Sequence, residues 1–229
     1  MKKNSLFNWS GGKDSTLALH YVLQDKSFDV QYLLTTVNEA YNRVSMHGVR
    51  ESLLIEQVKS LDIPLYQIRL PESPDMAAYE AHMHKHLSFL KAEGITHSIF
   101  GDLFLEDLKT YREKKLRELG IEAVFPIWKR DTTEVLKTFI SLGYKTVVVC
   151  AEAGLEEFVG RIIDESFIED LPSDVDPCGE NGEFHTFVFD GPIFKKPINF
   201  ALGEKVFKTY PSPNGQIDET TGYWYIDLV

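Results

Sequence analysis

Short apolar segments alternate with amphipathic ones along the first two thirds of the chain. The apolar segments have the length and character of buried strands. They cover residues 6–9, 30–37, 64–70, 98–100, 123–125 and 146–150. The amphipathic segments carry apolar residues at helical spacing and cover residues 17–22, 49–61, 76–90, 110–119 and 132–142. Strands separated by helices of this length imply β-α-β crossovers, which predict a mostly parallel sheet with helices on both faces.

The pattern weakens from about residue 155, where prolines become frequent. Residues 184–189 and 223–228 read as antiparallel strands, and Pro211–Gly215 reads as a turn between strands. We therefore predict an α/β fold with a doubly wound, mostly parallel sheet over residues 1–154. A smaller C-terminal α+β domain is expected over residues 155–229.

Composition narrows the class of protein. A chain of 229 residues with 43% hydrophobic content can bury a sizeable core, and its two cysteines form no C-x-x-C pair. Cys150, at the end of an apolar strand, is expected in the core, and Cys178 is expected to be structural. We expect no signal peptide and no membrane span, because no apolar run approaches the ~20 residues that cross a bilayer. The expected location is therefore cytoplasmic.

The formal net charge of −11 disfavours attraction to nucleic-acid phosphates. It favours small-molecule or protein substrates. A homodimer is left open.

The candidate chemistry begins with the segment Ser10-Gly11-Gly12-Lys13-Asp14-Ser15, between the first predicted strand and the first predicted helix. Unpaired N–H groups and the positive helix end favour an anion there, and paired glycines allow phosphate oxygens to approach the backbone. Lys13 would neutralise charge, and the two serines could donate hydrogen bonds. A carboxylate at Asp14 makes sense if it holds a magnesium ion that bridges phosphates.

The spacing of this loop differs from the ordinary P-loop G-x-x-x-x-G-K-[ST]. It resembles the S-G-G-x-D-S loop of the ATP-pyrophosphatase superfamily. Together with Ser45–Arg50, Gly101-Asp102, Asp176–Thr186 and Phe187–Phe194, it makes nearly the whole chain similar to the diphthine–ammonia ligase family, also called the diphthamide synthase ATP-binding domain.

The resemblance implies an adenine-nucleotide α-hydrolase-like fold and an ATP-dependent reaction. The carboxylate of diphthine, a modified histidine on a translation factor, would be adenylated and then converted to an amide by ammonia, releasing AMP and pyrophosphate. ATP and Mg²⁺ are the implied cofactors. By position, the resemblance implies that the nucleotide is bound by Ser10, Gly11, Gly12, Lys13, Asp14 and Ser15. Gly101 and Asp102 are implied to lie in the nucleotide or metal region. Glu180, Glu183 and His185 are implied to orient the acceptor or to take the proton that ammonia loses.

Two residues depart from the family pattern. Many members read closer to Glu-Gly-Gly-Glu-Phe-Glu-Thr where this chain has Asn181 and His185, which makes the acceptor segment distinctive. In a bacterium, where diphthine is absent, the substrate would be another carboxylate. Two alternatives are left open. The first is a tRNA-modifying ATP-pyrophosphatase, for which a close pair of cysteines and a basic face are expected, and this chain shows neither clearly. The second is a nucleotide-binding sensor that does not turn over its nucleotide.

Several other residues admit two interpretations. His47 either contacts a nucleotide phosphate or caps a helix that begins near Val49. His82 and His86 share a helix face, but no nearby cysteine completes a metal site, so a solvated helix is favoured. Trp128 could stack on adenine, although a buried aromatic at a strand end is favoured.

Overall fold

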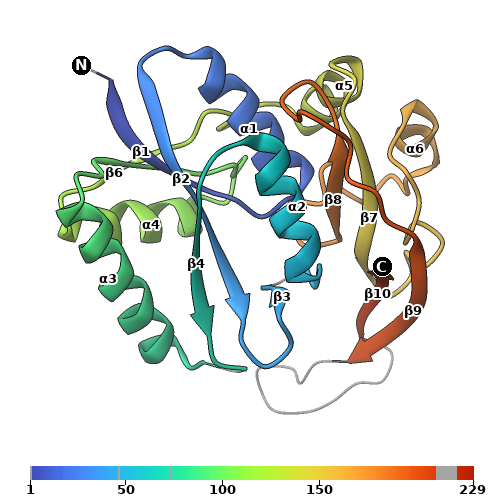
Figure 1. Ribbon diagram of the computed structural model, residues 1–229. Helices are drawn as coiled ribbons and strands as arrows, with labels where there is room; N and C mark the ends of the chain where they lie inside the picture. Colours follow the sequence, from blue (N-terminus) through green and yellow to red (C-terminus); the bar gives the residue numbers. More distant parts are fainter. Residues whose placement is uncertain (1, 46, 73, 210–220) are drawn as a thin grey trace.

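The computed structural model describes residues 2–45, 47–72, 74–209 and 221–229, which form two sheets (Figure 1). The first sheet consists of β1 (Lys3–Asn8), β2 (Phe28–Asn38), β3 (Arg43–Val44), β4 (Leu65–Leu70), β5 (His97–Ile99) and β6 (Glu122–Val124). The second consists of β7 (Lys145–Glu152), β8 (Phe184–Asp190), β9 (Leu202–Thr209) and β10 (Gly222–Leu228).

The strands of the first sheet other than β3 are parallel and lie in the order β4-β2-β1-β5-β6. The short β3 pairs antiparallel with the end of β2, beyond the end of β1. The chain adds strands outward from β1 in one direction and then returns to add β5 and β6 on the other side. This order confirms the predicted doubly wound sheet, and it makes the carboxyl ends of β1 and β5 the switch point where such folds bind ligands.

Helices cover both faces of the parallel sheet. Successive residues of a strand point to opposite faces, so each face presents apolar side chains for helices to cover. Leu6 of β1 packs with α3 and α4, whereas its neighbour Phe7 packs with α1 and α2. The helices are α1 (Lys13–Gln24), α2 (Glu51–Leu61), α3 (Met76–Ala92), α4 (Glu106–Glu118), α5 (Thr132–Ser141) and α6 (Glu165–Asp170). Among the described residues, no helix combines the length and apolar character that a membrane span requires.

The second sheet is antiparallel in the order β8-β7-β10-β9 and corrects one prediction. Residues 146–150 were expected in the parallel sheet, but they lie in β7, between β8 and β10. The reason is that β7 is buried at every position from Thr146 to Ala151, and such a strand reads alike in either kind of sheet. The predicted domain boundary after residue 154 stays a prediction. Along the chain, the last strand of the first sheet is β6 and the first strand of the second sheet is β7.

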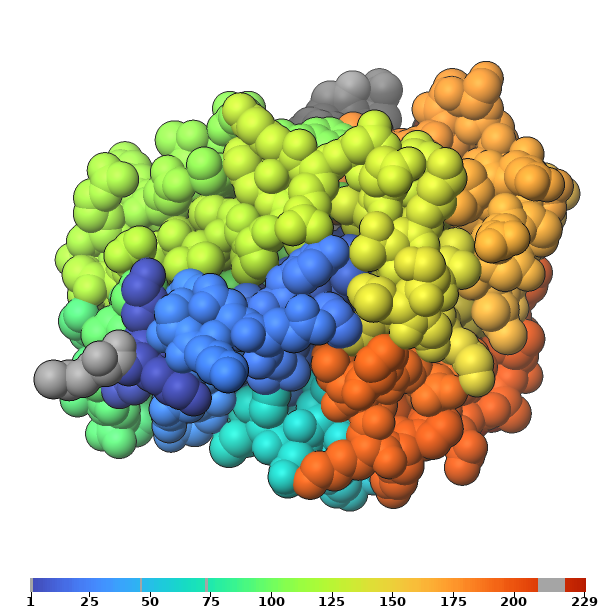
Figure 2. All heavy atoms as spheres, turned by 90° about the horizontal axis from the view of Figure 1, so that it is seen from above, coloured from blue at the N-terminus to red at the C-terminus, as the bar shows by residue number. Residues whose placement is uncertain are grey.

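The predicted antiparallel strands at 184–189 and 223–228 are confirmed as parts of β8 and β10. The predicted turn Pro211–Gly215 lies outside the described residues. Figure 2 shows the two parts of the chain side by side, with blue atoms of the N-terminal segment bordering yellow and orange atoms from later in the chain.

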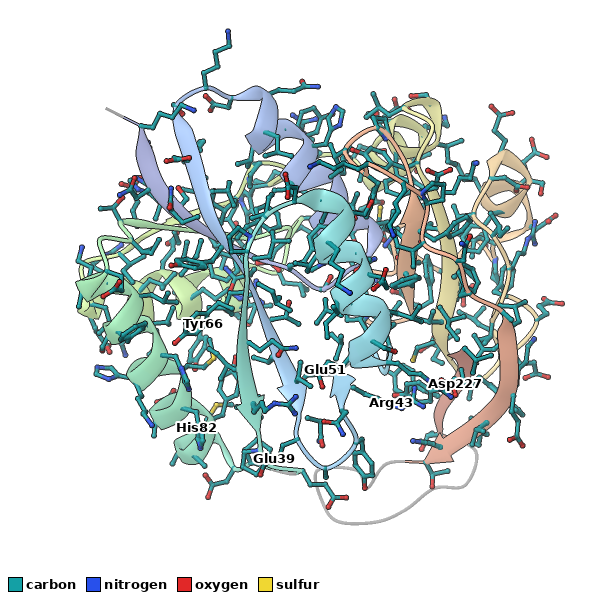
Figure 3. All side chains as sticks on the ribbon, in the orientation of Figure 1. Glu39, Arg43, Glu51, Tyr66, His82 and Asp227 are labelled. Carbon is teal, nitrogen blue, oxygen red and sulfur yellow. The ribbon has the colours of Figure 1, made fainter. Side chains whose placement is uncertain are left out.

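One ion-pair cluster joins the last strand to the first sheet. The Asp227 carboxylate in β10 accepts hydrogen bonds from Arg43 Nη1 at 2.9 Å and from Arg50 Nε at 3.1 Å (Figure 3). Arg43 Nη1 also donates to the Gly48 carbonyl at 2.7 Å. The cluster therefore ties β10 to the segment that connects β3 with α2.

Acid is expected to weaken this connection. Hydrogen bonds from Arg50 lower the pKa of Asp227 from its ordinary 3.8 to about 2, opposed by partial burial and reinforced by Arg43. Because the folded pKa is depressed, the stabilisation is complete above the unfolded value and is lost as pH falls through the folded value. Asp227→Asn should therefore be less stable than the parent at pH 7, and the difference in urea midpoint should close below about pH 2.

The exposed carboxylate of Glu157 supplies the control. Glu157→Gln should differ from the parent by a small amount that stays constant over the same pH range. An Asp227→Asn protein whose deficit is equal at pH 7 and at pH 2 would contradict the assignment.

Candidate active site

The glycine-rich loop lies at the switch point of the parallel sheet. It follows β1 and leads into α1, which begins at Lys13 after Gly12 at the N-cap position, without a side-chain cap. Gly11 has φ +80°, a conformation that glycine adopts without strain. Ser10 and Ser15 hydrogen-bond to each other, with 3.0 Å between their hydroxyl oxygens. Because the N-cap glycine supplies no side-chain acceptor of its own, a helix N-terminus beside two glycines favours an anion, as predicted for this loop.

The second sheet completes the loop. The Val188 N–H in β8 donates to the Gly11 carbonyl at 2.9 Å, and the Lys13 N–H donates to Thr186 Oγ1 at 3.0 Å. The site is therefore built between the two sheets, with the loop on one side and β8 on the other.

The Lys13 side chain is buried rather than extended toward solvent. Its ammonium donates to Asp14 Oδ2 at 2.9 Å and to the Cys178 carbonyl, and it lies 5.1 Å from the centre of the Phe184 ring. Burial by itself lowers the pKa of Lys13, but Asp14, Cys178 and Glu180 together raise it above its ordinary value. Lys13 is therefore a fixed cation at the base of the loop.

Asp14 has one oxygen that its surroundings leave unpaired. Its Oδ2 binds Lys13, whereas its Oδ1 is buried and has no hydrogen-bond partner among the described residues. Burial raises the pKa of Asp14, and Lys13 opposes that rise. A buried carboxylate oxygen without a partner is costly unless a ligand supplies one.

These features fit a magnesium ion. The described residues contain no group of three or more His, Cys, Asp or Glu side chains arranged for a metal. Magnesium in nucleotide sites needs no such group, because one or two carboxylates act together with phosphate oxygens and water. The unpaired Oδ1 of Asp14, beside an anion-binding loop, matches that donor set.

Glu180 and Asp102 bring further carboxylates to the same place. Burial, together with the charge of Asp14, raises the pKa of Glu180 to about 8, and Glu180 Oε2 accepts a 3.4 Å hydrogen bond from the Leu103 N–H. Asp102, which also acts on the pKa of Glu180, is paired with Arg112 of α4. Glu180 thus lies near Lys13 and Asp14, and Asp102 lies near Glu180.

Glu183 has the contacts of a residue that organises its loop. It is 6% exposed, and its oxygens accept hydrogen bonds from the N–H groups of Asp176 and Asn181 and from the Asn181 side chain. Burial alone raises the pKa of Glu183, but these donors lower it below its ordinary value. A catalytic role for Glu183 stays a prediction, and its donors account for its position without one.

Two histidines lie beside the loop. The rings of His47 and His185 are 4.7 Å apart between centroids, and a side chain at Gly12 would meet His47 at 3.1 Å. Burial lowers the pKa of His47 to about 3, with a contribution from His185, and burial lowers the pKa of His185 to about 4. Both imidazoles are therefore neutral at physiological pH and can accept a proton or a hydrogen bond.

The alternative role of His47 as a helix cap is wrong. Helix α2 begins at Glu51, Arg50 occupies the N-cap position, and no side chain caps the helix. His47 instead places Nδ1 3.4 Å from the Thr186 carbonyl. His47 lies beside Gly12, and its contact with a nucleotide phosphate stays a prediction.

Gly101 packs directly against the start of α1. A Cβ at this position would lie 2.8 Å from both Cα and N of Ser15, closer than real Cβ atoms approach. The glycine thus allows β5 and α1 to approach each other. A direct contact with nucleotide is not needed to explain it.

Gly101→Ala is expected to displace the start of α1 and to destabilise the protein by roughly 1–3 kcal/mol, as overpacking does. Urea unfolding would measure the change. Gly143→Ala is a suitable comparison, because its Cβ would meet no atom within 4 Å and only its φ of +84° is unfavourable. Gly143→Ala therefore measures the cost of backbone strain without a clash, and a Gly101→Ala protein as stable as the parent would show that the contact with Ser15 is harmless.

The remaining singled-out residues take structural positions. Cys150 is confirmed in the core, and Cys178 Sγ donates to the Thr132 carbonyl at 3.2 Å. Trp128 is half-buried rather than buried, with the Lys109 ammonium 4.8 Å from its ring centre. His86 Nδ1 lies 2.9 Å from the Tyr66 hydroxyl.

The fold and the site define a class: a doubly wound α/β protein with a glycine-rich loop between β1 and α1 at its switch point. Family models narrow this class. The diphthamide synthase N-terminal domain matches residues 1–123, and the diphthamide synthase C-terminal domain matches residues 131–220. The chain therefore belongs to the diphthamide synthase family.

Curated relatives carry the name diphthine–ammonia ligase. The chain is 27% identical to the Homo sapiens protein over 132 residues, which cover 54% of this chain and 49% of that protein. The chain is 28% identical to the Danio rerio protein over 132 residues, which cover 54% of this chain and 52% of that protein. The chain spans about half the length of these relatives.

A solved structure titled as a predicted subunit of tRNA methyltransferase from Methanocaldococcus jannaschii covers 86% of this chain and 100% of its own. The TM-score is 0.43 and the sequence identity is 16%. This likeness is too low to support a functional conclusion.

Proposed function

We propose that this protein is an ATP-dependent ligase that joins ammonia to a carboxylate and releases AMP and pyrophosphate, as a diphthine–ammonia ligase does. One observation carries the proposal. The buried, unpaired Oδ1 of Asp14 lies in the first turn of α1, whose uncapped glycine N-terminus stands at the switch point of the sheet. The names of the relatives supply the substrate class.

The reaction follows from the chemistry of a carboxylate, which is a poor electrophile without a good leaving group. A carboxylate oxygen attacks the α-phosphorus of ATP, the bond to the β-phosphate oxygen breaks, and pyrophosphate leaves. Ammonia then attacks the carbonyl carbon of the acyl adenylate and AMP leaves. The nitrogen loses one proton as the amide forms.

Residues of the loop would stabilise the first step. The N-terminus of α1 faces the phosphates, and the fixed cation of Lys13 lowers the cost of gathering negative charge there. Mg²⁺ bound at Asp14 Oδ1 would neutralise phosphate charge. Because Lys13 already pairs with Asp14, the two residues are expected to act as a unit.

The second step needs a proton acceptor. His185 is neutral and lies beside the loop, and because burial lowers its pKa to about 4, its imidazole is better suited to accept a hydrogen bond from ammonia than to take its proton. Glu180, whose pKa is raised to about 8, is the other candidate on the same side of the loop. The name of the relatives, diphthine–ammonia ligase, favours diphthine as the carboxylate acceptor. We expect its carrier to be a translation factor in the cytoplasm.

Release of pyrophosphate tests the proposal. The protein would be mixed with ATP, Mg²⁺ and ammonium, with and without candidate carboxylates, and pyrophosphate and AMP would be followed. Formation of both in equal amounts, dependent on a carboxylate and on ammonium, is the expected result. Tight ATP binding without pyrophosphate for any acceptor would favour a nucleotide sensor instead.

A further inference from the structure

A single buried amide side chain links the glycine loop to both sheets. Gln57 of α2 is 0% exposed, and its Nε2 donates to the Gly11 carbonyl at 3.0 Å and to the Val188 carbonyl at 2.6 Å. Its Oε1 accepts from Trp9 Nε1 at 3.2 Å. One side chain thus contacts the end of β1, the loop and β8.

The position of Gln57 is unusual for its helix. It lies between Leu54 and Val58, on the face that α2 buries, where an apolar residue would otherwise pack. A buried amide is tolerated only when its polar atoms are satisfied, and here each donor and acceptor atom has a partner. Nothing in the packing of α2 alone requires an amide at this position.

The loop and Gln57 are fitted closely to each other. A Cβ at Gly11 would lie 2.5 Å from Gln57 Oε1, and Gly11 has φ +80°. The Gly11 carbonyl accepts from both Gln57 and the Val188 N–H, which fixes the direction of the peptide unit that follows it. That unit carries the N–H of Gly12, at the N-cap position of α1.

We infer that Gln57 is a positioning residue for the nucleotide loop, with Thr186 as its second support from β8. The inference rests on the proposed function, because it concerns the affinity of the same loop for ATP. Gln57 holds the Gly11 peptide, and Thr186 Oγ1 holds the Lys13 N–H. Between these two points the N–H groups at the start of α1 keep one orientation before nucleotide arrives, which lowers the entropy cost of binding.

The test compares three substitutions in the full chain. Gln57→Met keeps the length of the side chain and removes its hydrogen bonds, and Thr186→Val keeps the β-branched shape in β8. Ser60→Ala is the matched control, since Ser60 is also buried in α2 and donates to the Lys196 carbonyl at 2.6 Å, away from the loop. Calorimetric titration with ATP and Mg²⁺, thermal melting and amide hydrogen exchange would be measured for each.

Gln57→Met and Thr186→Val should each weaken ATP binding by roughly ten- to hundredfold, as expected for the loss of one or two hydrogen bonds that orient the loop. Ser60→Ala should lower the melting temperature and leave ATP affinity unchanged. If Gln57→Met fails to fold, Thr186→Val carries the test by itself. Parent-like affinity in the folded variants, or an equal loss of affinity in Ser60→Ala, would overturn the inference.

Hydrogen exchange separates this inference from the proposed function. If the parent protein binds no ATP, the proposed function fails. The amides of residues 11–14 in the nucleotide-free protein then decide the inference. Faster exchange confined to those amides in Gln57→Met supports a positioning role, and unchanged exchange overturns it.

Discussion

Asp14→Asn should lower pyrophosphate release by roughly 10²- to 10³-fold, the usual cost of removing one charge-stabilising group from an active site. The variant should also be less stable than the parent, because the buried ammonium of Lys13 loses the charge of its partner. The unpaired Oδ1 of Asp14 offsets part of this loss, since a neutral amide is less costly to bury than a carboxylate. Activity and stability would thus both fall, and the dependence of the rate on Mg²⁺ separates the loss of a metal ligand from the loss of stability.

The measurement combines initial rates of pyrophosphate release over a range of Mg²⁺ concentrations with urea unfolding of the nucleotide-free protein. Asp131→Asn is the matched control, because Asp131 caps α5 by accepting from the Glu134 N–H, and asparagine caps equally well. The control should keep both activity and stability. A fully active Asp14→Asn protein with unchanged dependence on Mg²⁺ would refute the metal assignment.

Lys13→Met should abolish pyrophosphate release and also destabilise the protein by about 3–5 kcal/mol, the usual cost of removing one partner of a buried ion pair. Lys13 is 3% exposed, and its ammonium is the cation that faces Asp14 and Glu180. Without it, Asp14 loses the charge that opposes the effect of burial, beside a Glu180 whose raised pKa of about 8 already keeps it protonated at neutral pH, so Asp14 is expected to take up a proton as well. The loss of stability should therefore shrink as pH falls and the carboxylates become neutral.

Urea unfolding between pH 5 and 8, alongside the pyrophosphate assay, would measure both effects. Lys109→Met provides the comparison, because that lysine also lies over aromatic rings but pairs with an exposed partner, Glu113, on the surface of α4. It should change stability by less than about 1 kcal/mol. A stable, active Lys13→Met protein would show that neither the ion pair nor the cation is needed.

These two expectations depend on different kinds of information. That the loop is suited to an anion could be inferred from two glycines between an apolar strand and an amphipathic helix. That Lys13 donates to the Cys178 carbonyl could not, because Cys178 lies 165 residues from Lys13 along the chain. Local sequence spacing carries no information about such a contact.

The role of Gln57 could not be predicted from the sequence either. Along α2 it is one polar residue on a stripe of apolar ones, and that irregularity is the only trace that the chain gives of its role. The predicted pair of Glu180 and Glu183 shows the converse. The sequence places them three residues apart in one motif, but the fold gives Glu180 a raised pKa and gives Glu183 a full set of donors.

The sequence by itself determined the order and type of most helices and strands, because periodicity and strand length are local properties of the chain. It also determined the position of the glycine-rich loop and the resemblance to a family, since both depend on short stretches of particular residues. Only the tertiary structure decided that β7 joins the antiparallel sheet, that β8 holds the loop, and that Glu180 lies near Lys13 and Asp14. Burial, hydrogen-bond partners and pKa shifts all depend on distances between segments far apart in sequence, and those distances are set when the two sheets pack together.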